Sequence, residues 1–252
     1  MVETFLLCLI AGFAAQMIDG SLGMGYGIIL SIILSSMGMS PIGVSASVHV
    51  AKFFATGASG FSHLKFGNVD KALATKLALG GIVGAIVGAF ILKNVPGDII
   101  KPVTAVYLTV MGILIVYKAR HKAEPRDEIR RVTPLGVLGG FCDAIGGGGW
   151  GAIVTSGLLV KGKNPRLAIG SVSLAEFFVS ITIIGLLITE VPQLVTQIHI
   201  IAGLVVGSAL AAPIAAYVCG RVAPRPLLAA VGSLIIILSG STVLGALLAL
   251  GR

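Results

Sequence analysis

Two glycine-rich runs interrupt apolar stretches of the chain and restrict what it can fold into. Residues 20–27 read GSLGMGYG and residues 146–151 read GGGGWG. Asp19 directly precedes the first run, and Asp143 lies three residues before the second. Glycine lacks a Cβ, so such a run can leave helical geometry and let the backbone approach a ligand closely. Inside a bilayer, the break is tolerated only where protein or a water-filled cavity satisfies the freed backbone groups. We therefore expect both runs to line one central site.

The composition places the chain in a membrane. Only 11% of the 252 residues are charged, less than half of the roughly 25% that is typical of soluble domains. Apolar stretches of roughly 20 residues, separated by short polar links, favour transmembrane helices over a β-barrel. The formal net charge of +8 does not indicate nucleic acid as a partner, because the basic residues lie at predicted helix ends. The prediction is an all-α membrane protein whose partner is the lipid bilayer.

The second half of the chain repeats the first. A shift of 124 residues places Asp19 on Asp143, and Lys52 on Glu176, without any gap. The same shift relates these further pairs: Gly23 and Gly147, Gly25 and Gly149, Tyr26 and Trp150, Gly27 and Gly151, Pro41 and Pro165, and Ser47 and Ser171. Three later glycines match only with smaller shifts, which pair Gly81, Gly84 and Gly88 with Gly203, Gly207 and Ala211. This pattern indicates an internal duplication.

The duplication predicts two transmembrane repeats, residues 1–119 and 132–252, joined by a linker over 120–131. Each repeat is expected to hold about five helical segments, and an odd number puts the halves in opposite orientations as inverted repeats. The segments of the first repeat are expected near residues 5–18, 28–37, 41–61, 73–92 and 99–117. The first two segments of each repeat either both span or form a re-entrant pair. Their shortness favours half-helices that meet near the bilayer midplane.

The distribution of basic residues predicts the orientation. Of the 18 Lys and Arg residues, all but Lys52, Lys93, Lys101 and Arg252 fall on one side of the predicted segments. Because cytoplasmic loops carry the excess of Lys and Arg, the loop over 118–131 is expected in the cytoplasm and both termini outside.

The second segment of each pair begins at a glycine run, so its N-terminus offers free N–H groups and the positive end of the helix dipole. Such an end binds anions without a cationic side chain. Lys52, within the third segment, is expected to add positive charge. Tyr26 and Trp150 either wall this site, pack in the interior or form an interface belt. The predicted substrate-binding residues are Gly23, Gly25, Tyr26, Gly27, Lys52, Gly147, Gly148, Gly149, Trp150 and Gly151.

Four further residues are candidates for coupling or gating: Asp19, His49, Asp143 and Glu176. Carboxylates inside a membrane are costly, so they are functional candidates that can carry a proton or hold Na⁺. The alternative for Asp19 and Asp143 is that each caps the glycine turn beside it. Lys52 and Glu176 either form an ion pair that stabilises the fold, or serve an anion pathway in which Glu176 titrates. No second histidine accompanies His49, so neither a metal site nor a cofactor is expected.

Enzyme signatures such as GxSxG and HExxH are absent from the sequence, so no enzyme is expected. The duplicated Asp–glycine–aromatic run, followed by Pro165 and residues 168–171 (AIGS), resembles the sulfite exporter TauE/SafE family, as does the segment 60–70 (GFSHLKFGNVD). The resemblance covers essentially the whole chain. The second glycine run is the closer match, since Ser21, Leu22 and Met24 interrupt the first.

This resemblance implies a multi-pass protein of the inner (plasma) membrane that moves small sulfur-containing anions, such as sulfite or organosulfonates like sulfoacetate. Export is usual in the family, and some relatives are linked to uptake. We therefore expect a secondary transporter that works by alternating access, coupled to H⁺ or Na⁺. The alternatives are an anion channel of the same architecture, an uptake transporter for a sulfur oxyanion, and a membrane scaffold or enzyme subunit whose glycines only pack helices. A homodimer is left open.

Overall fold

The computed structural model describes residues 2–120, 132–161, 163–187, 198–219 and 221, and beyond these only 229, 233, 236 and 237. Within this part of the chain there are nine helices and no strand. The helices are α1 (Val2–Leu22), α2 (Tyr26–Ser36), α3 (Pro41–Lys65), α4 (Lys71–Asn94), α5 (Gly97–Arg120), α6 (Thr133–Gly146), α7 (Trp150–Val160), α8 (Pro165–Leu186) and α10 (Ile198–Val218). Apart from Arg120 and residues 229, 233, 236 and 237, the predicted linker and the last stretch of the second repeat lie outside the described residues.

Five helices are long and apolar enough to cross a membrane: α1, α4, the first 18 residues of α5, α8 and α10. Large apolar side chains face outward on them, including Leu79, Phe90 and Leu210, each of which is more than half exposed. Such a surface suits a hydrocarbon solvent. The prediction of an all-α, multi-pass membrane protein is confirmed.

Polar caps set the starts of the long helices. The Ser40 side chain accepts a hydrogen bond from the Gly43 amide at 3.2 Å, and Pro41 occupies the first turn. Asn164 does the same at the equivalent place in the second half, where its side chain accepts from the Arg166 amide at 3.0 Å. Both arrangements satisfy amides that have no partner within the helix. The predicted helix start at Pro41 is confirmed.

The short segments differ from the prediction in one respect. Helices α2 and α7 have 11 residues each and α6 has 14, and 11 residues span about 16 Å, half of a hydrocarbon core. Helix α1 is longer than the predicted 5–18, because Gly20, the first glycine of the run, stays helical. The chain leaves the helix only around Gly23 and Gly25, which both have positive φ, as do Gly147 and Gly149. Only glycine adopts these angles readily, so the breaks fall at equivalent positions of the two halves.

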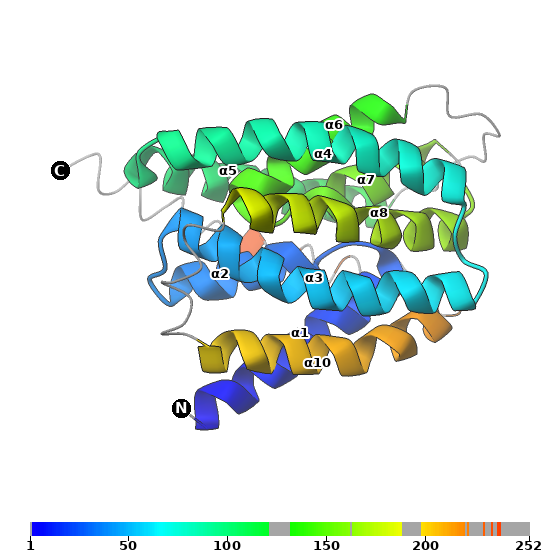
Figure 1. Cartoon of the computed structure of the whole chain (residues 1–252), viewed down its shortest axis with the longest axis horizontal. Helices are drawn as coiled ribbons and strands as arrows, with labels where there is room; N and C mark the ends of the chain where they lie inside the picture. Colours follow the sequence, from blue (N-terminus) through cyan, green and yellow to red (C-terminus); the bar gives the residue numbers. More distant parts are fainter. Residues whose placement is uncertain are drawn as a thin grey trace.

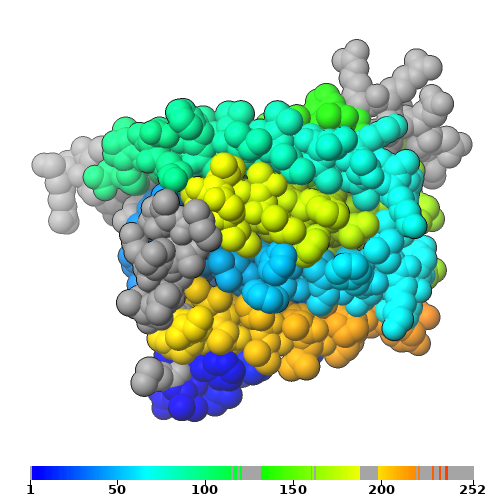
Figure 2. Space-filling view, in the orientation of Figure 1, coloured from blue at the N-terminus to red at the C-terminus, as the bar shows by residue number. Residues whose placement is uncertain are grey.

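The two halves exchange packing partners. Helices α4, α8, α3 and α10 lie side by side in this order (Figure 1), and Figure 2 shows them as adjoining bands on one face. Helix α1 of the first half packs on α10 of the second, and α6 of the second half packs on α4 of the first. Each half therefore completes the core of the other.

The contacts correct the sequence matching of α4 with α10. Gly80 packs against Thr133 and Val137 of α6, and Gly207 packs against Leu9 and Phe13 of α1. Because Leu9 and Phe13 are the counterparts of Thr133 and Val137, Gly207 corresponds to Gly80 and not to Gly84. The offset in this pair of helices is therefore 127, one helical turn away from the sequence match, which is wrong here. An offset that rises from 124 in α8 to 127 in α10 implies three additional residues between the matched positions of these two helices.

Two pairs of equivalent residues touch each other. Lys52 contacts Glu176 with 2.6 Å between Nζ and Oε1, and the Phe53 and Phe177 rings stack with centroids 5.2 Å apart and planes inclined by 22°. Contact between equivalent positions is what a two-fold relation between halves produces. The opposite orientation of the halves in the membrane remains a prediction.

Candidate functional site

The two glycine runs meet at the centre of the molecule. A Cβ on Gly27 would lie 2.5 Å from the Gly147 carbonyl oxygen, 2.8 Å from Gly148 Cα and 3.0 Å from Lys52 Cε. In the equivalent contact, a Cβ on Gly151 would lie 2.6 Å from Met24 Cα. A side chain at either glycine would push the runs apart. The absence of side chains therefore lets the start of each short helix touch the glycine run of the other half.

Two side chains that the sequence analysis missed hold these runs. The Thr155 hydroxyl donates to the Gly23 carbonyl at 2.5 Å, and the Tyr107 hydroxyl donates to the Gly148 carbonyl at 3.2 Å. Thr155 has a signal in the sequence, since the shift of 124 places it on the hydroxyl residue Ser31. Nothing in the sequence marks Tyr107, which α5 brings in from elsewhere in the fold.

Carboxylates of the chain itself occupy the starts of α2 and α7. Asp19 Oδ1 accepts from the Tyr26 amide at 3.3 Å, and Asp143 Oδ1 accepts from the Trp150 amide at 3.3 Å. The first intrahelical bonds come from Ile29 and the equivalent Ile153, so the capped amides are among those without a helical partner. The capping contact that the sequence analysis weighed for both aspartates is therefore present. It places a carboxyl group at each helix N-terminus.

The rings of Tyr26 and Trp150 are engaged elsewhere. Both side chains are buried, so neither lies in an interface belt. The Tyr26 hydroxyl is 2.7 Å from the Ser208 hydroxyl on α10, and Trp150 Nε1 donates to the Val172 carbonyl on α8 at 3.1 Å. Their backbone amides, rather than their polar side-chain atoms, face the aspartates. The rings pack the short helices against the long ones.

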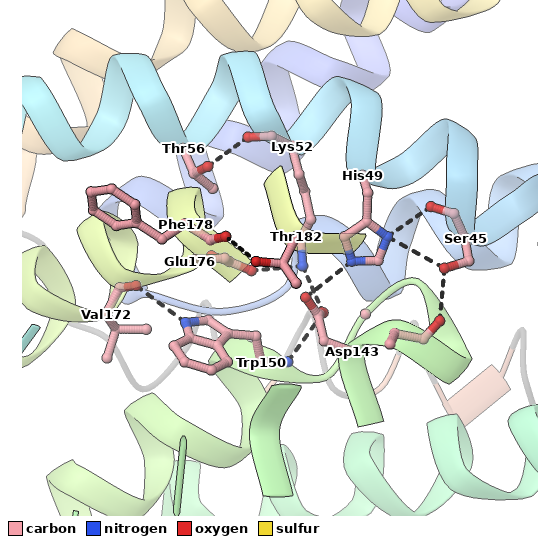
Figure 3. Close-up of polar contacts among 12 residues, drawn as sticks. Ser45, His49, Lys52, Thr56, Asp143, Trp150, Val172, Glu176, Phe178 and Thr182 are labelled. Atoms are coloured by element: carbon pink, nitrogen blue, oxygen red, sulfur yellow. Dashed lines mark hydrogen bonds and ion pairs between the residues drawn. The ribbon is translucent and has the colours of Figure 1, made fainter. Parts of the chain in front are cut away.

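Lys52 lies at the junction of the two halves (Figure 3). It is 1% exposed, and its Nζ donates to Asp143 Oδ1 at 2.7 Å and lies 2.6 Å from Glu176 Oε1. Among the described residues it is the one buried Lys or Arg. The ion pair with Glu176 was one of the two predicted alternatives for these residues. The sequence predicts that the second carboxylate, Asp143, lies near the glycine run, but it does not predict the contact between Asp143 and Lys52.

His49 binds the other oxygen of the same aspartate. Its Nδ1 is 2.7 Å from the Ser45 carbonyl oxygen, and its Nε2 is 3.2 Å from Asp143 Oδ2. A carbonyl oxygen can only accept, so Nδ1 carries a hydrogen and donates. A lone pair on Nε2 facing a lone pair on Oδ2 at 3.2 Å would be unfavourable, so the geometry favours a hydrogen between these two atoms. Asp143 therefore contacts the Lys52 ammonium through Oδ1 and the His49 imidazole through Oδ2.

Four of the predicted residues thus form one polar cluster, in which Lys52, His49, Asp143 and Glu176 are joined by direct contacts. Asp19 binds the Tyr26 amide at the start of α2. Gly25 and Gly149 are the cap residues of α2 and α7. In the part of the chain that the structure describes, no group of three or more His, Cys, Asp or Glu side chains is arranged to hold a metal ion.

A second polar cluster ties two connections together at one end of the bundle. Arg166 Nε donates to Asn68 Oδ1, and Lys163 Nζ lies 3.1 Å from Asp70 Oδ2. These contacts join the connection between α3 and α4 to the connection between α7 and α8. The hydrogen bond from the Leu73 amide, with help from Lys163, lowers the pKa of Asp70 below its usual range.

Comparisons with known proteins identify a family of membrane transporters. The sulfite exporter TauE/SafE family profile matches residues 8–242. The probable membrane transporter protein YtnM of Bacillus subtilis is 38% identical over 242 residues, which cover 92% of this chain and 80% of that protein. The probable membrane transporter protein ORF9 of a Sinorhizobium species is 28% identical over 156 residues, 60% of this chain and 59% of that protein. No solved structure matches. The chain belongs to the sulfite exporter TauE/SafE family of membrane transporters.

Proposed function

We propose that this protein is an ion-coupled secondary transporter that exports small sulfur-containing anions, such as sulfite or an organosulfonate, by alternating access. The family supplies the sulfur chemistry. Residues of the two glycine runs, with Lys52, form the proposed substrate site, and the buried carboxylates with His49 provide coupling. The proposed setting is the inner membrane, with both termini outside and the loop over 118–131 in the cytoplasm.

One observation carries this proposal. The one buried ammonium among the described residues lies where two helix N-termini and two glycine runs meet. Lysine is rarely buried without a functional or paired role in a membrane, and helix N-termini favour anions. Asp143 and Glu176 take the place of the anion on Lys52 in the substrate-free state, and a substrate anion binds by exchanging with a carboxylate. In this proposal the carboxylates hold the site closed until substrate arrives.

The packing of the halves supports alternating access. Because α1 packs on α10 and α6 packs on α4, we expect each of these two helices to move with the long helix of the other half. Rocking of one unit against the other about the Lys52–Glu176 contact then opens the site to one side at a time. The cluster of Arg166, Asn68, Lys163 and Asp70 closes the end proposed to face the cytoplasm.

Counterflow in proteoliposomes tests the function. Vesicles preloaded with unlabelled sulfite are diluted into radiolabelled sulfite, and the label accumulates transiently if a carrier exchanges one anion for another. We expect saturable accumulation that unlabelled sulfoacetate or thiosulfate suppresses if it shares the site. The control for loss of a carboxylate outside the site is Asp98→Asn, which removes an exposed carboxylate of α5. This variant should transport normally. Flux without counterflow would show a channel, and folded protein without flux for any sulfur anion would refute the proposal.

A further inference from the structure

The buried core of this protein holds more negative than positive groups. Among the described residues, the buried side chains that ionise strongly are three carboxyl groups, Asp19, Asp143 and Glu176, and one ammonium, Lys52. Lys52 contacts both Asp143 and Glu176 directly, and His49 contacts Asp143. Asp19 is the one carboxylate of these three that no cation of the described residues contacts directly, and Lys52 acts on it electrostatically from a greater distance.

The internal repeat shows what is missing at Asp19. In one half, Asp143 caps a short helix and binds two basic side chains, His49 and Lys52. In the other half, Asp19 caps the equivalent helix with the same 3.3 Å bond, but the counterparts of His49 and Lys52 are Ser173 and Glu176. The equivalent place therefore carries a hydroxyl and a second carboxylate. Glu176 and Asp19 are close enough to interact electrostatically.

A buried amide beside Asp19 is unpaired. Gln16 lies one turn before Asp19 on α1 and is fully buried, and neither its oxygen nor its nitrogen has a hydrogen-bond partner in the described part of the chain. Its Nε2 and the Ser59 hydroxyl approach the same point beside Gly20, at 3.2 and 3.6 Å from where a Cβ would lie. The Ser59 hydroxyl in turn accepts from Ser173 at 2.9 Å. An unpaired buried amide is costly, and the unpaired Oε1 of Gln16 is available as a cation ligand near a carboxylate that no cation contacts directly.

We infer that Asp19, with Glu176, Gln16 and Ser173, binds one monovalent cation, Na⁺ or H⁺, which takes the place that Lys52 and His49 hold in the other half. Carboxylate, amide and hydroxyl oxygens are the ligands that hard cations prefer. An arriving anion then meets a neutral site instead of a net negative one, so cation and anion bind together. This consequence for coupling rests on the proposed transport function, whereas the cation site itself does not.

Thermal unfolding of the detergent-purified full chain tests the cation site. NaCl is titrated against choline chloride at constant chloride and ionic strength, over a pH series, without any sulfur anion. Bound Na⁺ raises the melting temperature by mass action. If the cation is a proton, the melting temperature depends on pH in choline chloride, and Asp19→Asn removes that dependence. The elements near Asp19 carry other charged or titratable groups. These are Lys52, His49 and His63 of α3, Asp143 of α6, Glu176 of α8, Tyr26 of α2, and His199 and Tyr217 of α10.

Gln16→Met separates a ligand role from a structural one. Methionine has nearly the same volume and removes two buried polar atoms that have no protein partner, so the variant should fold and melt at or above the wild-type temperature in choline chloride. The inference predicts that its apparent Kd for Na⁺ nevertheless rises at least about tenfold, as expected when one bond to a charged group is lost. Asp19→Asn should abolish the Na⁺ shift, while Asp98→Asn should retain it. For a proton site, Gln16→Met displaces the pH midpoint instead.

Two results would overturn the inference. One is a melting temperature that is the same in Na⁺ and choline at every pH of the series. The other is a cation or pH effect that survives in both Gln16→Met and Asp19→Asn. A sulfite-induced shift that is independent of Na⁺ and pH would refute the linkage between cation and anion binding, while leaving the cation site and anion transport in place. A cation shift without any sulfite counterflow would support the cation site and refute the function.

Discussion

Replacing Lys52 by methionine should destabilise the protein strongly and in a way that a second substitution relieves. The ammonium lies 2.7 Å from Asp143 Oδ1 and 2.6 Å from Glu176 Oε1, and all three groups are buried. Removing one partner of a buried ion pair costs about 3–5 kcal/mol, because the remaining charge stays buried without a partner. Methionine keeps the length of the lysine stem, so little of this loss comes from packing.

The double variant Lys52→Met/Glu176→Gln isolates the charge effect. It removes one of the two carboxylates that the first change leaves uncompensated, and Asp143 retains His49 on its other oxygen. We expect a favourable coupling of about 2 kcal/mol between the two changes. The deficit of the single variant should also shrink at low pH, where protonation neutralises the unpaired carboxylates.

The assay is thermal unfolding in detergent, where 1 kcal/mol corresponds to about 2–4 °C for a chain of this size. Lys52→Met should therefore melt about 6–20 °C below wild type, and the double variant should regain part of the difference. Lys76→Met, at an exposed lysine of α4, is the control for loss of charge. If Lys52→Met melts like Lys76→Met, or if the double variant is no better than the single one, the assignment of charges at the junction is wrong.

Two further predictions concern the glycine contact and the α4 cap. Gly27→Ala should lower the unfolding free energy by about 1–3 kcal/mol through overpacking. The control Gly185→Ala, where a Cβ meets nothing within 4 Å, should be neutral or slightly stabilising. Equal melting temperatures for the two variants would contradict the contact between the glycine runs. Asp70→Ala should cost about 1 kcal/mol of unfolding free energy, as for a lost helix cap. Folding lowers the pKa of Asp70. Wild type should therefore be more stable than Asp70→Asn above about pH 4, and it should lose this advantage as the pH falls through the folded pKa. Melting curves recorded over a pH series test this prediction.

The sequence predicts the site better than it predicts the helices around it. The breaks at Gly23 and Gly147 follow from the chemistry of glycine, and the meeting of Lys52 with Glu176 follows from their equivalent places in a duplicated chain. The shared aspartate does not follow, because a repeat relates positions and does not say which side chain crosses between halves. Gln16 carries no signal at all, since its counterpart Gly140 packs directly on α4 backbone. The length of α1 was misjudged because Gly20 is compatible with a helix.

The corrected register of α4 and α10 can be tested by moving one packing unit between the halves. With an offset of 127 in these helices, Tyr26, Ala55 and Ser208 of one unit correspond to Trp150, Val179 and Gly81 of the other. A Cβ on Gly81 would lie 2.5 Å from the Trp150 ring and 2.6 Å from Val179 Cγ2, whereas Tyr26 hydrogen-bonds to Ser208 at 2.7 Å. Gly81→Ser alone should therefore cost about 1–3 kcal/mol of unfolding free energy. Adding Trp150→Tyr and Val179→Ala to Gly81→Ser reproduces the set Tyr26, Ala55 and Ser208 at the equivalent positions of the other unit. After the effect of Trp150→Tyr/Val179→Ala without Gly81→Ser is subtracted, the triple variant should recover at least half of the cost of Gly81→Ser. Additive destabilisation in the triple variant would show that the two units are not equivalent, and the match of Gly207 to Gly80 would then have to be abandoned.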